Sequence, residues 1–138
     1  MSNISIIKAL GYAGLIPFVI PAIVVMANIG DAEIATLIAE TYAFGIICFL
    51  TGSWWGMAAK PGNHATIMLS NGYFLIAFMV LILAQQWWSL AASILLVGIF
   101  ILEGSKSLFP ALSDDYRKLR AILTLVSSAS MLAIHLAR

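Results

Sequence analysis

The chain has very little charge for its length. Of its 138 residues only 9% are Asp, Glu, Lys or Arg, whereas 62% are apolar, and the mean hydropathy is +1.03. Soluble domains are about 25% charged and about 45–50% apolar, so this composition excludes a water-soluble globular domain. The net charge of +1 also provides no basic surface for nucleic acid. Lipid is therefore the expected solvent for most of the chain.

The residues that common catalytic and metal sites require are equally scarce. A single cysteine, Cys48, excludes a disulfide framework and a cysteine-ligated metal site. It lies within an apolar run without a histidine nearby in sequence, so no nucleophile and base are paired. The two histidines, His64 and His135, are predicted on opposite sides of the membrane. We find no phosphate-binding glycine loop, no paired intramembrane carboxylates and no internal repeat. We predict no enzymatic activity, no metal and no cofactor.

Long apolar runs predict an all-α fold, an integral membrane helix bundle that forms one domain over residues 1–138. A spanning helix takes about 20 residues, so five helices use about 100 and leave about 38 for connections. Pro17 and Pro21 should kink the first helix, because each lacks a backbone donor. The predicted helices lie at about 9–29, 37–59, 65–84, 87–104 and 120–137, with a cytoplasmic loop at about 104–119.

The distribution of basic residues predicts the orientation of the bundle. With five spans, all but one of the cations fall on one side, which the positive-inside rule makes cytoplasmic. The N-terminus is then cytoplasmic and the C-terminus periplasmic, in a multi-pass protein of the bacterial inner membrane. The cations on the cytoplasmic side are Lys8, Lys60, Lys106, Arg117, Lys118 and Arg120, and Arg138 alone lies on the other side.

Small residues and tryptophans suggest contacts with helices and with the membrane surface. Gly45, Gly52 and Gly56 share one face of the second predicted helix, and such a face lets another helix approach closely. We favour packing within the chain, with a dimer interface as the alternative. Four tryptophans near the ends of the runs are predicted interfacial anchors, namely Trp54, Trp55, Trp87 and Trp88.

A basic segment precedes the last predicted helix. Ser113 or Asp114 can cap a short interfacial helix there. Arg117, Lys118 and Arg120 would then face anionic lipid headgroups, or they would form a docking patch for a partner protein.

A few polar residues lie within or beside the apolar runs. Glu40, Asn71 and His135 are candidates for a polar path, with Glu40 and His135 as a pair if they lie at similar depth. Glu103 could instead pair with Lys106, three residues further along the chain. The simpler interpretation is that these ionisable groups are hydrated at the ends of the helices.

Three segments resemble domain-of-unknown-function family 3429. They are Gly11–Phe18 (GYAGLIPF), the stretch from Tyr42 that ends in FLTGSWWG at Gly56, and Tyr116–Thr124 (YRKLRAILT). The resemblance covers nearly the whole chain, and Trp54 stands where the family pattern has a histidine. It implies a small multi-spanning membrane protein, with members in proteobacteria and uncharacterised mitochondrial relatives, and it implies no catalytic residue.

These features favour a non-catalytic accessory or assembly component of a larger membrane complex, which contacts lipid and either a protein partner or further copies of itself. The mitochondrial relatives make a respiratory membrane a reasonable setting. A small oligomeric channel or proton-linked carrier is the alternative. A third interpretation is lipid or quinone binding between helices, with Trp54 and Trp55 at the mouth.

Overall fold

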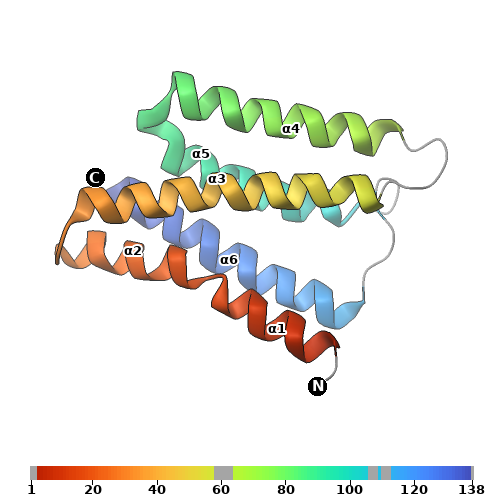
Figure 1. The fold of residues 1–138 in the computed structure, drawn as a ribbon, viewed down its shortest axis with the longest axis horizontal. Coiled ribbons are helices and arrows are strands. Elements are labelled where there is room, and N and C mark those ends of the chain that lie inside the picture. Colours follow the sequence, from red (N-terminus) through yellow and green to blue (C-terminus); the bar gives the residue numbers. More distant parts are fainter. Residues whose placement is uncertain (1–2, 58–63, 106–108, 110–112, 138) are drawn as a thin grey trace.

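The computed structural model describes residues 3–57, 64–105, 109 and 113–137, and the described part is helical throughout with short connections (Figure 1). Five segments are long and apolar enough to cross a membrane, which confirms the all-α five-span prediction. The helices are α1 (Asn3–Ala13), α2 (Ile16–Ala27), α3 (Ala32–Met57), α4 (His64–Leu83), the 3-10 turn η1 (Gln85–Trp87), α5 (Trp88–Glu103) and α6 (Asp114–Ala137).

The first span consists of two helices, α1 and α2, which together cover Asn3–Ala27. Pro17 lies in the first turn of α2, where its missing N–H leaves a carbonyl in α1 without its helical donor. The hydroxyl of Tyr42, on α3, donates to the nearby carbonyl of Gly14 at 3.0 Å. The kink predicted from the prolines is thus a break before Pro17, and the helix continues through Pro21. The predicted start near residue 9 is wrong, because α1 begins at Asn3.

Capping explains why α3 begins earlier than predicted. Asn28 ends α2 in the left-handed conformation, with φ of 54°. Asp31 Oδ1 then accepts from the backbone N–H groups of Glu33 and Ile34, at 3.0 and 3.1 Å. A side-chain acceptor at this position satisfies donors that the first helical turn leaves free. The helix therefore starts at Ala32 rather than near residue 37.

The last helix also starts earlier than predicted, at Asp114 rather than near residue 120. Ser113 Oγ accepts from the N–H of Tyr116 at 3.3 Å, and Asp114 and Asp115 lie in the first turn. Negative side chains are favourable there, because the helix dipole is positive at its N-terminus. The interfacial helix predicted at this position is thus the beginning of the last span, and the predicted loop over about 104–119 is too long.

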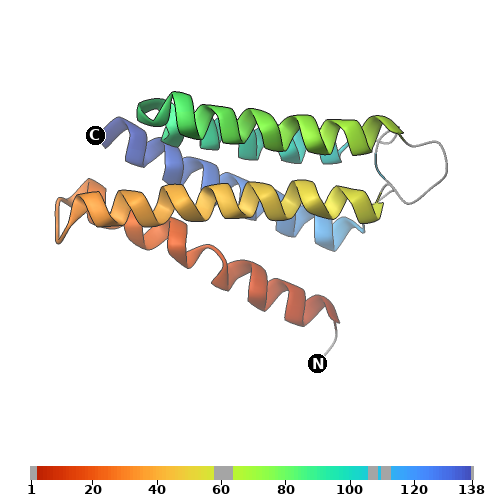
Figure 2. The same ribbon diagram turned by 45° about the horizontal axis from the view of Figure 1, so that its top comes forward.

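Helices α2, α3, α5 and α6 form the centre of the bundle. Helix α2 packs on α3 and α6, α5 packs on α6 and α3, and α4 lies against α3 and α5. Helix α1 packs along α6 and diverges from α3 (Figure 2). The buried face of α3 carries small side chains, because Ala39 and Ala43 are both fully buried.

Two buried carboxylates mark the two ends of the bundle, and we name the ends after them. The Glu103 end holds the N-terminus of α1, the last residues of α3 and α5, and the start of α4 and α6. The Glu40 end holds the turns between α2 and α3 and between α4 and α5, together with the last turn of α6 (Figure 1).

Replacement of Tyr42 by Phe should destabilise the protein by about 1–3 kcal/mol, because the Gly14 carbonyl would lose its donor in a low-dielectric environment. Thermal unfolding of the purified protein in detergent measures the change. Tyr12→Phe is the matched control, because Tyr12 is exposed. Equal melting temperatures for the two variants would contradict a structural role for this bond.

Candidate functional site

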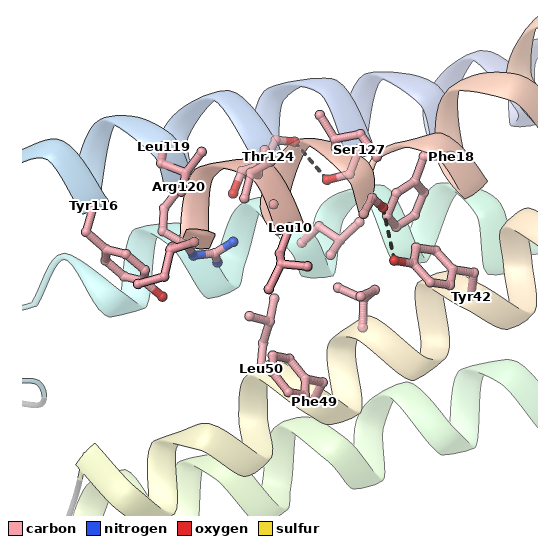
Figure 3. Close-up of a pocket in the computed structure, with 17 residues that line it drawn as sticks. Leu10, Phe18, Tyr42, Phe49, Leu50, Tyr116, Leu119, Arg120, Thr124 and Ser127 are labelled. Atoms are coloured by element: carbon pink, nitrogen blue, oxygen red, sulfur yellow. Dashed lines mark hydrogen bonds between the residues drawn. The ribbon is translucent and has the colours of Figure 1, made fainter. Parts of the chain in front are cut away.

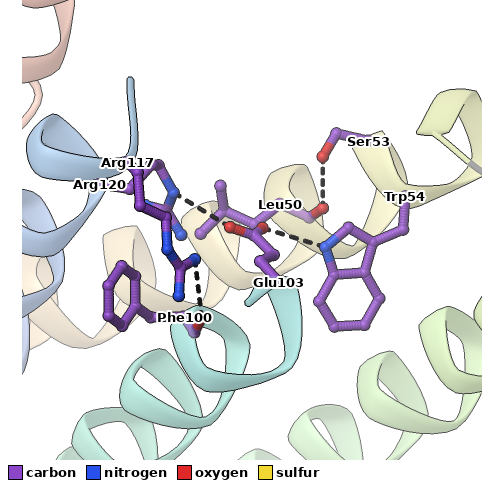
Figure 4. A network of polar contacts seen from close by, with 7 residues as sticks. All are labelled: Leu50, Ser53, Trp54, Phe100, Glu103, Arg117 and Arg120. Atoms are coloured by element: carbon purple, nitrogen blue, oxygen red, sulfur yellow. Dashed lines mark hydrogen bonds and ion pairs between the residues drawn. The ribbon is translucent and has the colours of Figure 1, made fainter. Parts of the chain in front are cut away.

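Glu103, the last residue of α5, lies at the centre of a buried polar network (Figure 4). Trp54 Nε1, on α3, donates to Glu103 Oε1 at 3.1 Å, and Arg120 Nε, on α6, donates to Oε2 at 3.3 Å. The side chains of Glu103 and Arg120 are only 2% and 8% exposed. One carboxylate therefore joins three helices at this end of the bundle.

This network corrects the sequence predictions for Arg120 and Trp54. Glu103 bonds to Arg120 and Trp54, whereas Lys106, its predicted partner, lies outside the described residues. Arg120 does not face lipid headgroups, because it is buried against Glu103. Trp54 is fully buried, so it is neither an interfacial anchor nor at the mouth of a ligand site. The two partners of Glu103 are distant in sequence, and no local pattern indicates such pairs.

Arg117, one turn before Arg120, is also held within the protein. Its guanidinium carbon lies 4.1 Å from the centroid of the Phe100 ring, and its Nη1 donates to the Phe100 carbonyl at 3.3 Å. A cation over an aromatic face is attracted by the electron-rich ring. Of the three basic residues predicted to contact lipid or a partner, only Lys118 is exposed.

At the other end of the bundle Glu40 is buried between α3 and α5. Ser89 Oγ donates to Glu40 Oε1 at 2.6 Å, and Trp88 Nε1 donates to the Glu40 carbonyl oxygen at 3.0 Å. Trp88 is fully buried, so its prediction as an interfacial anchor is wrong, whereas Trp55 and Trp87 are exposed and stay predicted anchors. Glu40 also borders a polar cavity of about 480 Å³, which Glu33, Thr36 and Gln85 help to line.

The structure does not bring Glu40, Asn71 and His135 together into one path. Asn71 is exposed on α4, where its Nδ2 donates to the carbonyl of Ile67 in the same helix at 3.1 Å. The His135 ring lies beside Trp87, with centroids 5.7 Å apart, and its Nδ1 is buried without a hydrogen-bond partner among the described residues. Asn71 is therefore not part of one polar path with the other two, and the pairing of Glu40 with His135 stays a prediction.

The glycines predicted to pack within the chain do not do so. A Cβ atom added to Gly45, Gly52 or Gly56 would meet nothing within 4 Å. This glycine face of α3, which also carries the exposed Phe49, points away from the bundle. Among the residues that the structure describes, this geometry excludes intramolecular packing of the three glycines, and the intermolecular alternative stays a prediction.

A largely apolar groove of about 400 Å³ lies between α1, α3 and α6, near the Glu103 end (Figure 3). Arg120 is the one charged residue among the described residues that line it, and its guanidinium points toward the middle of the groove. The Nη2 atom of Arg120 is buried and has no hydrogen-bond partner among the described residues. The groove therefore combines an apolar wall with an unused buried donor.

A comparison with family models found a match over nearly the whole sequence. The model described as "Protein of unknown function (DUF3429)" matches residues 4–136. The chain belongs to the DUF3429 family. Comparisons of this DUF3429 protein with curated proteins and with solved structures found no match. It is thus a member of a family of unknown function with five helices suited to span a membrane.

The three segments that carry the resemblance to the DUF3429 family meet at the groove. Gly11–Phe18 contributes Leu15, the stretch from Tyr42 to Gly56 contributes Leu50, and Tyr116–Thr124 contributes Arg120. They are far apart in sequence, and the break before Pro17 and the divergence of α1 bring them around one space. Sequence reasoning identified these segments and missed the groove, because the separation of α1 from α3 has no local sequence signal.

Replacement of Glu103 by Gln should destabilise the DUF3429 protein by about 3–5 kcal/mol, because it leaves the charge of Arg120 buried and uncompensated. The double variant Glu103→Gln/Arg120→Met should recover part of that loss, since it removes both charges. Melting temperatures in detergent compare the two with Glu33→Gln, which neutralises an exposed carboxylate. A double variant less stable than Glu103→Gln would contradict this account.

Proposed function

We propose that this DUF3429 protein acts without catalysis, as an accessory or assembly component of a larger membrane complex. The proposed setting is the bacterial inner membrane, with the N-terminus cytoplasmic and the C-terminus periplasmic. The single observation that carries the proposal is the outward glycine face of α3, formed by Gly45, Gly52 and Gly56. The proposed use of this face is contact with a helix of another protein.

The physics of the bilayer supports this use of the glycine face. Lipid tails are as apolar as leucine, so helices associate in lipid through close packing at small residues rather than through the hydrophobic effect. Helix α3 is 26 residues long. Its three glycines leave the backbone accessible along about three turns of the helix. A partner helix can approach the backbone closely at the glycines, beside the exposed Phe49 side chain.

The internal polar groups agree with a role based on contact. Glu103 and Arg120 are bonded to each other, and Glu40 bonds to Ser89. Among the described residues, no three His, Cys, Asp or Glu side chains are grouped so that they could hold a metal ion. The polar side chains in question thus serve to join helices.

Mild extraction followed by native mass spectrometry should find this protein in a stoichiometric complex with a different membrane protein. Gly52→Leu should lower the share of complexed protein several-fold, because the larger side chain holds the partner backbone away. Gly72→Leu, on α4, is the matched control, since a Cβ there also meets nothing within 4 Å. Exclusively homo-oligomeric protein would contradict the accessory role and favour the second candidate function.

A small oligomeric channel or proton-linked carrier is the second candidate, and the polar cavity of about 480 Å³ beside Glu40 favours it. A buried carboxylate next to a polar cavity is a common feature of ion and proton pathways. Asn71 does not extend this cavity into the membrane, so a path would have to continue at an interface between copies.

Proton flux into liposomes that contain the purified protein tests the carrier function. Glu40→Gln should abolish the flux, because an amide cannot take up and release the proton. Glu33→Gln, which changes an exposed carboxylate at the edge of the same cavity, should leave most of it. Liposomes without measurable flux would remove this candidate.

A further inference from the structure

The groove at the Glu103 end owes its shape to the break in the first span. Helix α2 packs on α3, but α1 continues along α6 and away from α3 (Figure 2). The space between them is lined by Leu10 of α1, Leu50 of α3 and Leu123 of α6. Four lining side chains bear hydroxyls, namely Tyr42, Tyr116, Thr124 and Ser127.

The unpartnered nitrogen of Arg120 indicates that an acceptor belongs in this groove. The arginine side chain is 8% exposed, its Nε is committed to Glu103, and Nη2 is buried without a partner among the described residues. A buried donor without an acceptor is costly, and it costs more when the donor is charged. A ligand that offers an oxygen atom to Nη2 would remove this cost (Figure 3).

The charges around Arg120 favour an uncharged acceptor. Glu103 already balances the arginine at 3.3 Å, and no other described residue that lines the groove carries a charge. An anionic head would place a second negative charge beside the buried carboxylate, which is unfavourable in a low-dielectric site. A carbonyl oxygen accepts the same hydrogen bond and adds no charge.

The open side of the groove determines how a ligand can enter. Leu10 and Phe49 line the groove and are 68% and 70% exposed, so the opening faces outward between α1 and α3 with an apolar rim. In a membrane this rim is in contact with hydrocarbon, because Leu10 and Phe49 lie within spanning segments. A phospholipid would have to move its charged phosphate past these side chains, whereas an uncharged amphiphile would not.

The volume of the groove suits a ring with the beginning of a tail. A dry cavity of about 150 Å³ holds one benzene molecule, and this groove measures about 400 Å³. Aromatic side chains border it, with Phe18 and Tyr42 in an edge-to-face pair 5.1 Å apart. Edge and face contacts with aromatic side chains are favourable for a flat ring.

We infer that the groove between α1, α3 and α6 is a binding site for a membrane quinone. A ring carbonyl accepts a hydrogen bond from Arg120 Nη2, the ring lies among the aromatic side chains, and the apolar tail leaves between Leu10 and Phe49 into the lipid. Arg120 is the specificity-determining residue, and Glu103 positions its guanidinium. The site shares Phe49 with the glycine face of α3, but the Arg120 side of the groove lies apart from the glycines, so the inference does not rest on the proposed accessory role.

Titration calorimetry of the purified full chain in detergent tests this site, with a benzoquinone that carries a ten-carbon tail as the probe. The unaltered protein should bind the probe saturably. Arg120→Lys should weaken binding about tenfold or more, since the ammonium retains the charge opposite Glu103 but cannot supply the Nη2 hydrogen bond. Arg117→Lys is the matched control, because Arg117 contacts Phe100 and does not line the groove.

A second pair of variants tests the groove without altering any charge. Ser127→Leu places a larger side chain in the groove, fills part of its volume and should abolish binding. The Ser127 hydroxyl donates to the Thr124 carbonyl of its own helix, so the substitution removes a bond within α6 rather than one between helices. Ala129→Leu places the same side chain on the exposed face of α6 and should leave binding unchanged. If Arg120→Lys does not fold, this pair of variants still tests whether the probe binds in the groove.

Three results would overturn the inference. The first is the lack of saturable binding to the unaltered protein. The second is equal binding by Arg120→Lys and Arg117→Lys, or by Ser127→Leu and Ala129→Leu. The third is a co-purified phospholipid that native mass spectrometry detects and that the quinone probe does not displace, since the groove would then be a lipid site.

Discussion

The contact between Glu103, Arg120 and Trp54 is the constraint on which the rest of the bundle depends. Water is not available in hydrocarbon to hydrate a carboxylate or a guanidinium, so each must be satisfied by the protein. Glu103 reaches Trp54 on α3 and Arg120 on α6 at the same time. This requirement fixes the register of three helices, because a shift of one turn along α5 or α6 would separate the charges, and a shift of α3 would remove the Trp54 donor from Glu103.

The opposite end of the bundle uses the same principle with neutral donors. Glu40 accepts from Ser89 through its side chain and from Trp88 through its backbone carbonyl. Trp54 and Trp88, one at each end, therefore act as internal hydrogen-bond donors rather than as surface anchors. Between these ends, α3 presents small buried residues such as Ala39 and Ala43 to the helices packed against it. Polar contacts at the ends and small residues in the middle together define the helix arrangement.

Composition and hydrophobic run length were sufficient to predict the five spans, because the thickness of a bilayer sets the length of a spanning helix. The start of α6 was misplaced, since the capping residue Ser113 and the acidic first turn outweigh the polarity of the segment that follows. The sequence alone also suggested that Arg120 and Trp54 lie at the surface. Their burial depends on Glu103, which belongs to a different helix, and pairing between helices has no periodic sequence pattern.

The glycine face is the reverse case, because sequence spacing predicted packing inside the bundle for residues that face outward. Spacing correctly places Gly45, Gly52 and Gly56 on one side of α3, but spacing does not show whether that side faces the bundle. The face that packs inside carries Ala39, Ala43 and Ile47 instead. Alanine and glycine are both small enough for close helix contact, so residue size does not distinguish an inner face from an outer one.

The packing of α1 on α6 has a consequence for the order of assembly. Helix α1 packs mainly on α6, which lies far from it in sequence, so α1 is synthesised before the helix on which it packs. Helices α2 and α3 are consecutive, so they can pair before α6 is made. A chain truncated before α6 would keep α3 with its glycine face and would lack Arg120 and one wall of the groove.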